Sequence, residues 1–281
     1  ALLSPFLLSF LVLAVTALPA VKIDVEQQSI QNRIAGGESA LPGQFPYIVG
    51  VRHIKPIPGL GKITSWCGGS LISENLVVTA AHCVSGASYL EIILGKTDLS
   101  KDEEGSQILE VTPEYVTKHE DYDSIKGLND IALVKLPQSV KLTKTIQTVN
   151  LPRLSQRDNS FEKMIGWISG WGVLGDNNLS TKVLQWTRRW ILPNEYCRQV
   201  FPLHFKGETE ICLDGSQKIS ACRGDSGGPL VVDEEDGSKT LVGLTAYGKF
   251  EGCQKGFPVV FTRITAYLDW ISAKGGIKLR I

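Results

Sequence analysis

Three short stretches of the sequence carry side chains that could act together in nucleophilic catalysis. They read TAAHC at residues 79–83, NDIALVKL at 129–136 and GDSGGP at 224–229, and they supply His82, Asp130 and Ser226 in that order. A serine nucleophile needs a base within hydrogen-bond reach and a third group that orients the base. Histidine suits the first role, and a carboxylate on its far ring nitrogen suits the second. The combination therefore predicts covalent catalysis by a serine.

Each stretch taken alone has a simpler structural interpretation. A lone histidine in an apolar run is commonly a buried structural residue. Asp130 opens an apolar run and could be a turn or capping residue. GDSGGP could be an ordinary glycine-rich turn. The functional interpretation rests on the occurrence of all three in one chain.

The residues and order of these stretches resemble the chymotrypsin/trypsin-like family of serine proteases, from Ile34 to about Ile271. The resemblance implies that His82 is the general base and then the general acid, that Asp130 orients it, and that Ser226 is the nucleophile. It also implies an oxyanion hole formed by the backbone N–H groups of Gly224 and Ser226. The stretch at 252–271, GCQKGFPVVFTRITAYLDWI, is similar to arthropod digestive chymotrypsins and serine collagenases.

The stretch NRIAGG at residues 32–37 suggests activation by cleavage. The resemblance implies that a cut after Arg33 frees the α-amino group of Ile34, which then pairs with Asp225. A buried carboxylate without a partner is costly, so such a pairing explains the acidic residue beside the nucleophile. We therefore expect a zymogen.

The amino-terminal region predicts a secreted protein. Residues 1–20 carry no charge and end in small residues, as a signal peptide does, and we expect this peptide to be truncated at its start. A membrane anchor is the alternative interpretation. Residues 21–33 form the expected activation peptide, and residues 34–281 the protease domain. The expected location is extracellular.

Six cysteines in a secreted chain predict three disulfides, although spacing alone allows many pairings. The resemblance selects one set. The implied pairs are Cys67–Cys83, Cys197–Cys212 and Cys222–Cys253.

The resemblance also locates a specificity pocket, with Ser220 at its base and Gly248 and Val259 as its walls. Ser220 offers no negative charge, so a preference for Lys or Arg is not expected. Val259 should narrow the base, which favours Leu and Phe over Trp before the cut. An elastase-like preference for Ala or Val stays open, because one methylene changes discrimination by only about 1–3 kcal/mol.

Three further positions affect these expectations. Ala246 stands where the family generally has a serine that supports the catalytic aspartate. Lys96 stands at a calcium-ligand position, where a cation argues against that metal, and no other cofactor is expected. Asn178 opens the sequon NLS and is a candidate for glycosylation.

The elements that must position these residues read as short strands. Apolar runs lie at 76–81, 90–95, 131–136, 182–192 and 229–248, the last interrupted by Asp236-Gly237, a hairpin signal. Helical spacing is clear only at 266–273, with a shorter candidate at 194–201. The pattern predicts an all-β fold, a sandwich or a barrel pair. The resemblance narrows it to two packed six-stranded antiparallel β-barrels with a C-terminal α-helix. Residues 52–66, basic and Pro-rich, are expected to form a long surface loop.

Composition limits the partners. Lys+Arg and Asp+Glu number 29 each, which argues against a nucleic-acid surface. We expect no membrane partner and a monomer that meets protein or peptide substrates, a trypsin-like activating protease and proteinaceous inhibitors. A catalytically silent homologue is the main alternative, and an intact set of three catalytic residues speaks against it. A regulatory protease of narrow specificity is the second alternative.

Overall fold

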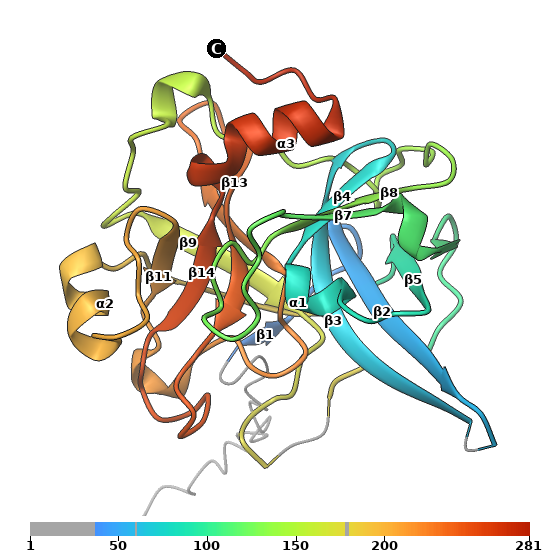
Figure 1. The fold of residues 1–281 in the computed structure, drawn as a ribbon, viewed down its shortest axis with the longest axis horizontal. Helices are drawn as coiled ribbons and strands as arrows, with labels where there is room; N and C mark the ends of the chain where they lie inside the picture. Colours follow the sequence, from blue (N-terminus) through green and yellow to red (C-terminus); the bar gives the residue numbers. More distant parts are fainter. Residues whose placement is uncertain (1–36, 60, 178–179) are drawn as a thin grey trace, which may run out of the picture. The chain divides into compact units, whose positions relative to one another are not determined.

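A computed structural model describes residues 37–59, 61–177 and 180–281, whose strands form two antiparallel sheets (Figure 1). The first sheet has the order β6-β5-β2-β3-β4-β8-β7 and the second the order β1-β10-β9-β12-β13-β14-β11. The predicted signal peptide, the cleavage site at Arg33 and Ile34, and the sequon residue Asn178 lie outside the described residues. No helix in the described part of the chain is long and apolar enough to cross a membrane.

The strands of the first sheet are β2 (Ile48–Ile57), β3 (Gly61–Ser73), β4 (Leu76–Thr79), β5 (Tyr89–Leu94), β6 (Gln107–Val111), β7 (Val116–Lys118) and β8 (Ala132–Lys135). The strands of the second sheet are β1 (Glu38–Ser39), β9 (Ile165–Gly170), β10 (Gln185–Trp190), β11 (Glu210–Leu213), β12 (Pro229–Asp233), β13 (Lys239–Tyr247) and β14 (Val259–Arg263).

The first sheet closes on itself through a bend between β6 and β7. β6 pairs with β5 at one edge and β7 pairs with β8 at the other, and only Thr112 and the 3₁₀ turn Pro113–Tyr115 connect them. The two segments are thus halves of one bent strand. Counted in this way, the sheet is the six-stranded barrel that was predicted.

The second sheet closes where the ends of β10 and β11 meet. Ile191 forms an antiparallel bridge with Leu213, and the Leu192 N–H donates to the Cys212 carbonyl at 2.9 Å. The seventh strand, β1, is only two residues long and adds to the outer side of β10. The predicted pair of antiparallel barrels is therefore confirmed.

One hydrophobic cluster joins the two sheets. It combines Ile72 and Leu133 of the first sheet with Val231 and Leu244 of the second, all fully or almost fully buried. Ile271 of the C-terminal helix packs in the same cluster. Burial of such side chains contributes about 1.5–3 kcal/mol each. The shared cluster fixes the two sheets against each other, which matters because the site lies between them.

The two predicted helices are present. α2 spans Asn194–Val200, and α3 spans Leu268–Gly275 after the 3₁₀ turn η4 (Ile264–Tyr267). α3 ends at Gly276, whose φ of 66° is left-handed and whose N–H donates to the Ser272 carbonyl. A third helix, α1 (Ala81–Val84), is a single turn.

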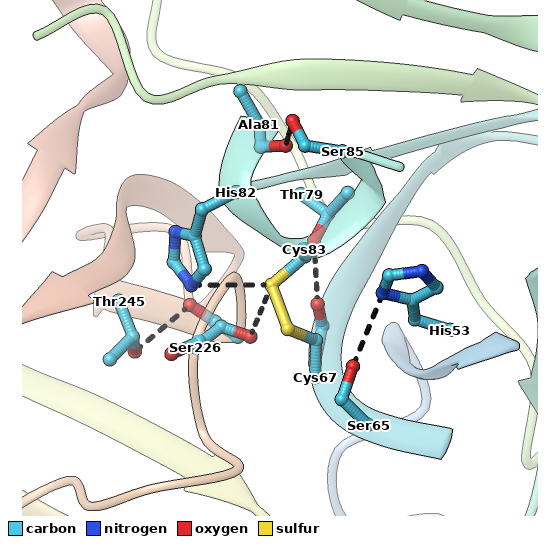
Figure 2. Close-up of a disulfide and its surroundings, with 12 residues drawn as sticks. His53, Ser65, Cys67, Thr79, Ala81, His82, Cys83, Ser85, Ser226 and Thr245 are labelled. Atoms are coloured by element: carbon cyan, nitrogen blue, oxygen red, sulfur yellow. Dashed lines mark hydrogen bonds between the residues drawn. A yellow bond between two sulfur atoms is a disulfide. The ribbon is translucent and has the colours of Figure 1, made fainter. Parts of the chain in front are cut away.

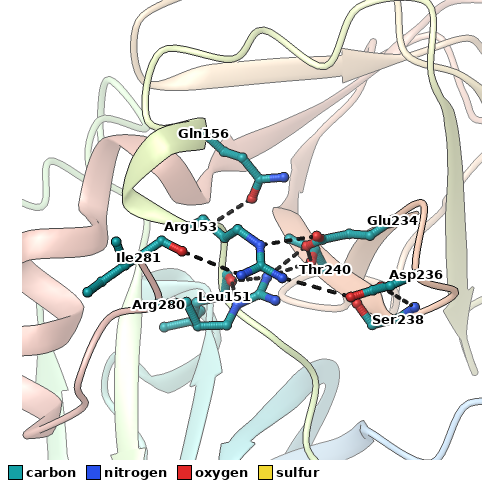
Figure 3. A network of polar contacts seen from close by, with 9 residues as sticks. All are labelled: Leu151, Arg153, Gln156, Glu234, Asp236, Ser238, Thr240, Arg280 and Ile281. Carbon is teal, nitrogen blue, oxygen red and sulfur yellow. Dashed lines mark hydrogen bonds and ion pairs between the residues drawn. The ribbon is translucent and has the colours of Figure 1, made fainter.

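The C-terminal tail is tied to the turn between β12 and β13 (Figure 3). This turn contains the predicted Asp236-Gly237 pair, with Gly237 at φ 80°. The Arg280 guanidinium donates to the Leu151 carbonyl and to Glu234 Oε1 at 2.8 Å. Arg153 lies between Glu234 and Asp236 and reaches the last carbonyl of the chain. The tail is thus held by two arginines and the acidic turn.

The expected loop at 52–66 is instead mostly a β-hairpin. β2 and β3 pair continuously from Ile48↔Ser70 to Ile57↔Gly61, and the hairpin extends beyond β5 in Figure 1. The prediction of a loop rested in part on Pro56, which a strand can contain at this position. β5 pairs with β2 only as far as Ile54, so Pro56 lies where the far edge of β2 is open and its missing N–H removes no bond to a third strand.

Candidate active site

His82 and Asp130 are brought together by two paired strands. β4 runs into α1, which carries His82, and Asp130 lies two residues before β8, while Thr79 pairs with Ala132. The Nδ1 of His82 lies 2.6 Å from Asp130 Oδ2, and the His82 backbone N–H donates to Oδ1 at 2.9 Å. An ionised carboxylate only accepts, so Nδ1 carries the proton and Nε2 is left as the basic nitrogen. Asp130 is 6% exposed, which keeps water from competing for these bonds.

Ser226 reaches this pair from the second sheet, just before β12. Its carbonyl accepts from the Gly68 N–H of β3 at 2.7 Å. The Cys83 Sγ lies 3.5 Å from the same carbonyl and 3.6 Å from His82 Nε2. Figure 2 shows the imidazole of His82 directed toward Ser226 beside the Cys67–Cys83 disulfide. The structure therefore gathers the three residues singled out in the sequence.

The turn before Ser226 leaves two backbone donors free. The N–H groups of Asp225 and Gly227 donate to the Cys222 and Thr245 carbonyls, at 3.0 and 2.7 Å. Within the described ranges, those of Gly224 and Ser226 have no acceptor. Gly224 has φ +95°, and a Cβ there would lie 3.0 Å from the Cα of Gly172. Glycine is thus required for a turn that leaves these two donors unpaired.

Asp225 is buried in a pocket walled by backbone. It is 3% exposed, and its oxygens accept the N–H groups of Gly172 and Cys222, each at 2.9 Å. A Cβ on Gly172 would lie 2.6 Å from the carboxyl group, so a side chain there would displace it. Burial raises the pKa of Asp225 to about 6, against the opposing effect of the two N–H groups. Among the described residues, no cation pairs with it.

A cavity of about 380 Å³ opens beside Ser226. Ser220, Gly248 and Val259, the predicted pocket residues, all line it. Ser220 is 3% exposed and donates to the Ala221 carbonyl. A Cβ at Gly248 would lie 3.9 Å from Val259 Cγ2, so the two walls approach each other closely.

All six cysteines are paired, in the three pairs that the resemblance implied. The Cys222–Cys253 disulfide joins two walls of the cavity. Lys96, at the expected calcium position, donates from its ammonium group to the Lys101 carbonyl at 2.6 Å.

Ala246 lies in a β-bulge of β13, where pairing with β14 shifts between Thr245 and Tyr247. It lines the cavity. Both carboxylate oxygens of Asp130 are engaged by His82, and no further donor to them is found in the described part of the chain. Ala246 therefore supplies no support to Asp130.

Three further residues of this region were not singled out in the sequence: Asp176, Tyr247 and Glu210. Asp176 lines the cavity, and its carboxylate accepts the Cys253 N–H at 2.6 Å, while Lys255 Nζ lies 4.0 Å away. Tyr247 also lines the cavity and donates its phenolic O–H to the buried Glu210 at 3.2 Å. The partners in these contacts are far apart in the chain, and no local pattern connects them.

Comparison with known proteins identifies the class. The family model described as Trypsin matches residues 34–271. A collagenase from Hypoderma lineatum is 36% identical over 247 residues, covering 88% of this chain and 89% of the relative. Chymotrypsin-C from Rattus norvegicus is 38% identical over 255 residues, covering 88% and 90%. The solved structure of HL collagenase has a TM-score of 0.76 at 36% identity, covering 86% of this chain and 99% of that one.

The chain therefore belongs to the trypsin family of serine proteases. Within it, this protein is a chymotrypsin-like serine endopeptidase with three disulfides.

Proposed function

We propose that the protein cleaves peptide bonds after apolar residues, with His82, Asp130 and Ser226 as its catalytic groups. The observation that carries this proposal is the 2.6 Å approach of His82 Nδ1 to Asp130 beside Ser226, at the edge of the cavity. The Ser226 Oγ attacks the substrate carbonyl while His82 Nε2 takes its proton. The same nitrogen then protonates the leaving amine, and an acyl-enzyme remains for water to hydrolyse. Asp130 holds the imidazole and stabilises its cation.

The oxyanion of each tetrahedral intermediate forms beside Ser226. The unpaired N–H groups of Gly224 and Ser226 are the donors that receive it. Because these donors belong to a fixed turn, they need no reorganisation when the charge develops. Each such donor typically contributes about 10²–10³-fold to the rate.

The cavity supports an apolar preference with an upper size limit. The Asp176 carboxylate is engaged by the Cys253 N–H and faces Lys255, so it offers little to a substrate cation. A Cβ built at Gly248 would lie 3.9 Å from Val259 Cγ2, so the branched side chain of Val259 fills space that a glycine at this position would leave open. We therefore place Leu and Phe ahead of Trp.

A peptide panel tests this proposal. The chain is cut briefly with trypsin, the trypsin is quenched, and peptides with Leu, Phe, Ala, Trp or Arg before the scissile bond are compared by kcat/KM. The Ser226→Ala variant is the matched control for residual trypsin. Leu and Phe should be cleaved fastest, and Arg at least about 100-fold more slowly. Fastest cleavage after Ala would assign the elastase-like alternative, and no cleavage at all would assign the silent homologue.

We also propose that the protein is a secreted zymogen activated after Arg33. Its support is the buried Asp225, which lacks a cation among the described residues, and the pairing of every cysteine, which suits an oxidising compartment. A monomer that meets an activating protease and inhibitors fits this proposal. The Arg33→Gln variant should stay inactive after trypsin treatment, whereas wild type gains activity. Full activity of that variant would refute the scheme, and a secreted reporter fused to residues 1–20 checks export.

A further inference from the structure

Glu210, at the start of β11, is a buried carboxylate that the catalytic steps leave unused. The residue is 6% exposed. Its Oε2 accepts two hydrogen bonds, from the Lys206 backbone N–H at 2.6 Å and from the Tyr247 O–H at 3.2 Å. A buried carboxylate persists only where donors compensate its desolvation. One of these two donors belongs to the wall of the substrate cavity.

Tyr247 connects this carboxylate to the cavity. The residue follows the β-bulge at Ala246, and bulges beside active sites commonly redirect a side chain. It lines the cavity together with Ser226, and its ring meets the edge of Phe201 at 5.6 Å between centroids. β14 lies between β13, which carries Tyr247, and β11, which carries Glu210. Neighbouring strands are about 4.8 Å apart, so the phenol reaches across β14 to the carboxylate.

Two contacts therefore fix the ring. Phe201 limits its tilt, and Glu210 holds its hydroxyl at the end remote from the backbone. Without the carboxylate, the phenol would have to find another acceptor in a mostly buried position. Rotation of the ring about its χ1 bond would then change the wall of the cavity.

Resting on the proposed function, we propose that Glu210 is a positioning residue for substrate binding, which holds the Tyr247 ring as a fixed wall beside Ser226. Glu210 itself lines no described part of that cavity. It acts on the substrate through Tyr247 alone. The consequence is a KM effect, since the reacting groups His82 and Ser226 are not touched.

The hydrogen bond changes with pH because burial raises the pKa of Glu210 to about 7. The charge of Asp130 adds to the rise, whereas the Lys206 N–H and ammonium and the Tyr247 O–H oppose it. Two other groups face Glu210 from packed elements. Tyr267 of η4 feels its charge, and Arg263 of β14 donates to its backbone carbonyl at 3.0 Å. Above this pKa, Tyr247 donates to a carboxylate, and below it to a neutral acid.

A hydrogen bond to a charged acceptor is stronger than one to a neutral acceptor by roughly a factor of two. Acidification through neutral pH should therefore loosen the ring and raise KM by about 3- to 10-fold. Glu210→Gln mimics the neutral acid at every pH, so its KM should stay high and change little with pH. KM and kcat are fitted separately at each pH, because the charge of Glu210 also acts on Asp130 and so on the catalytic base.

The experiment measures KM and kcat between pH 5.5 and 8.5 on a peptide with three residues before the scissile bond. The proteins are wild type, Glu210→Gln, Tyr247→Phe and the double variant, each cut after Arg33. Glu162→Gln is the matched control, because Glu162 accepts the Asn194 N–H but is not among the residues that line the cavity beside Ser226. At pH 8, each single variant should raise KM about 3- to 10-fold with little change in kcat, and the double variant should add nothing.

The outcomes separate this proposal from the proposed function. An active wild type with unchanged KM in Glu210→Gln, or additive effects in the double variant, overturns the positioning role alone. Wild type inactive on every peptide overturns the proposed function. In that case the same four proteins, in a urea unfolding cycle at pH 5.5 and 8, still test the bond. A coupling of Glu210 and Tyr247 that falls to about half at pH 5.5 supports it, and a constant or absent coupling refutes it.

Discussion

Asp225→Asn should change stability in opposite directions in the uncut and the cut protein. In the uncut chain, the pKa of Asp225 rises from 3.8 to about 6. The folded state then binds more protons than the unfolded state between these values, so the free energy of unfolding falls as pH rises through this window. A rise of this size in the pKa corresponds to about 3 kcal/mol of unfolding free energy, which is lost by about pH 7. The charge of Asp225 therefore destabilises the uncut protein at neutral pH.

Asparagine removes this charge but keeps one acceptor. Either the Gly172 or the Cys222 N–H loses its partner, which costs about 1 kcal/mol. The net effect on the uncut protein is a stabilisation of about 2 kcal/mol at pH 7.5 that reverses at pH 3, where the native carboxyl is neutral. After the cut, the Ile34 amine would face an asparagine instead of a carboxylate. An unpaired buried charge costs about 3–5 kcal/mol, so the cut variant should be less stable than cut wild type.

Urea unfolding at pH 3, 5 and 7.5 measures both effects, in a Ser226→Ala background that prevents self-digestion. Uncut and trypsin-cut samples are compared with and without Asp225→Asn. A stabilisation of the uncut protein that is equal at pH 3 and 7.5 would show that the buried charge is not its cause. The same sign in cut and uncut proteins would refute the pairing with Ile34.

Three further substitutions test the pocket, the oxyanion hole and the C-terminal tail. Val259→Ala widens the gap at Gly248, and the Phe/Leu ratio of kcat/KM on the peptide panel should rise about 10-fold; an unchanged ratio would exclude Val259 as the size limit. Gly224→Ala forces a side chain onto φ +95° and should lower kcat about 10²–10³-fold with KM nearly constant, measured on the Leu peptide. Arg280→Gln removes the ion pair with Glu234 and should lower the urea-derived stability by about 1–3 kcal/mol relative to Lys278→Gln, whereas equal stabilities would mean that the tail is not clamped.

The sequence was sufficient where chemistry restricts the residue type. Few residue types can take the roles suggested for Ser226, His82 and Asp130, so their types and order carried the information. Apolar runs likewise predicted the strands and an all-β fold, and the resemblance to the family narrowed that fold to the barrel pair. Each sheet has one strand more than predicted, because the chain bends at Pro113 and continues as a second segment in the first sheet, and because the two-residue β1 adds to β10 in the second.

Where tertiary contacts decide, the sequence was insufficient. α1 is four residues long, too short to show helical periodicity, yet it carries His82. Pro56 suggested a loop, but a strand can contain a proline where no neighbouring strand needs the missing N–H. The contact of Tyr247 with Glu210 crosses 37 residues and one intervening strand. No local signal encodes such a contact, because each residue alone is an ordinary tyrosine or glutamate.

The division of the catalytic groups between the two sheets has a consequence for biosynthesis. His82 and Asp130 leave the ribosome early, whereas β14, whose Thr262 donates to the Asp130 carbonyl, follows Ser226 and lies close to the end of the chain. Domains fold as units once their long-range contacts can form. A nascent chain therefore holds its histidine and aspartate without a nucleophile, and then a nucleophile without the strand that completes the second barrel. His82, Asp130 and Ser226 can therefore act together only after β14 has been synthesised, and a chain that stops before β14 lacks the strand that completes the second barrel.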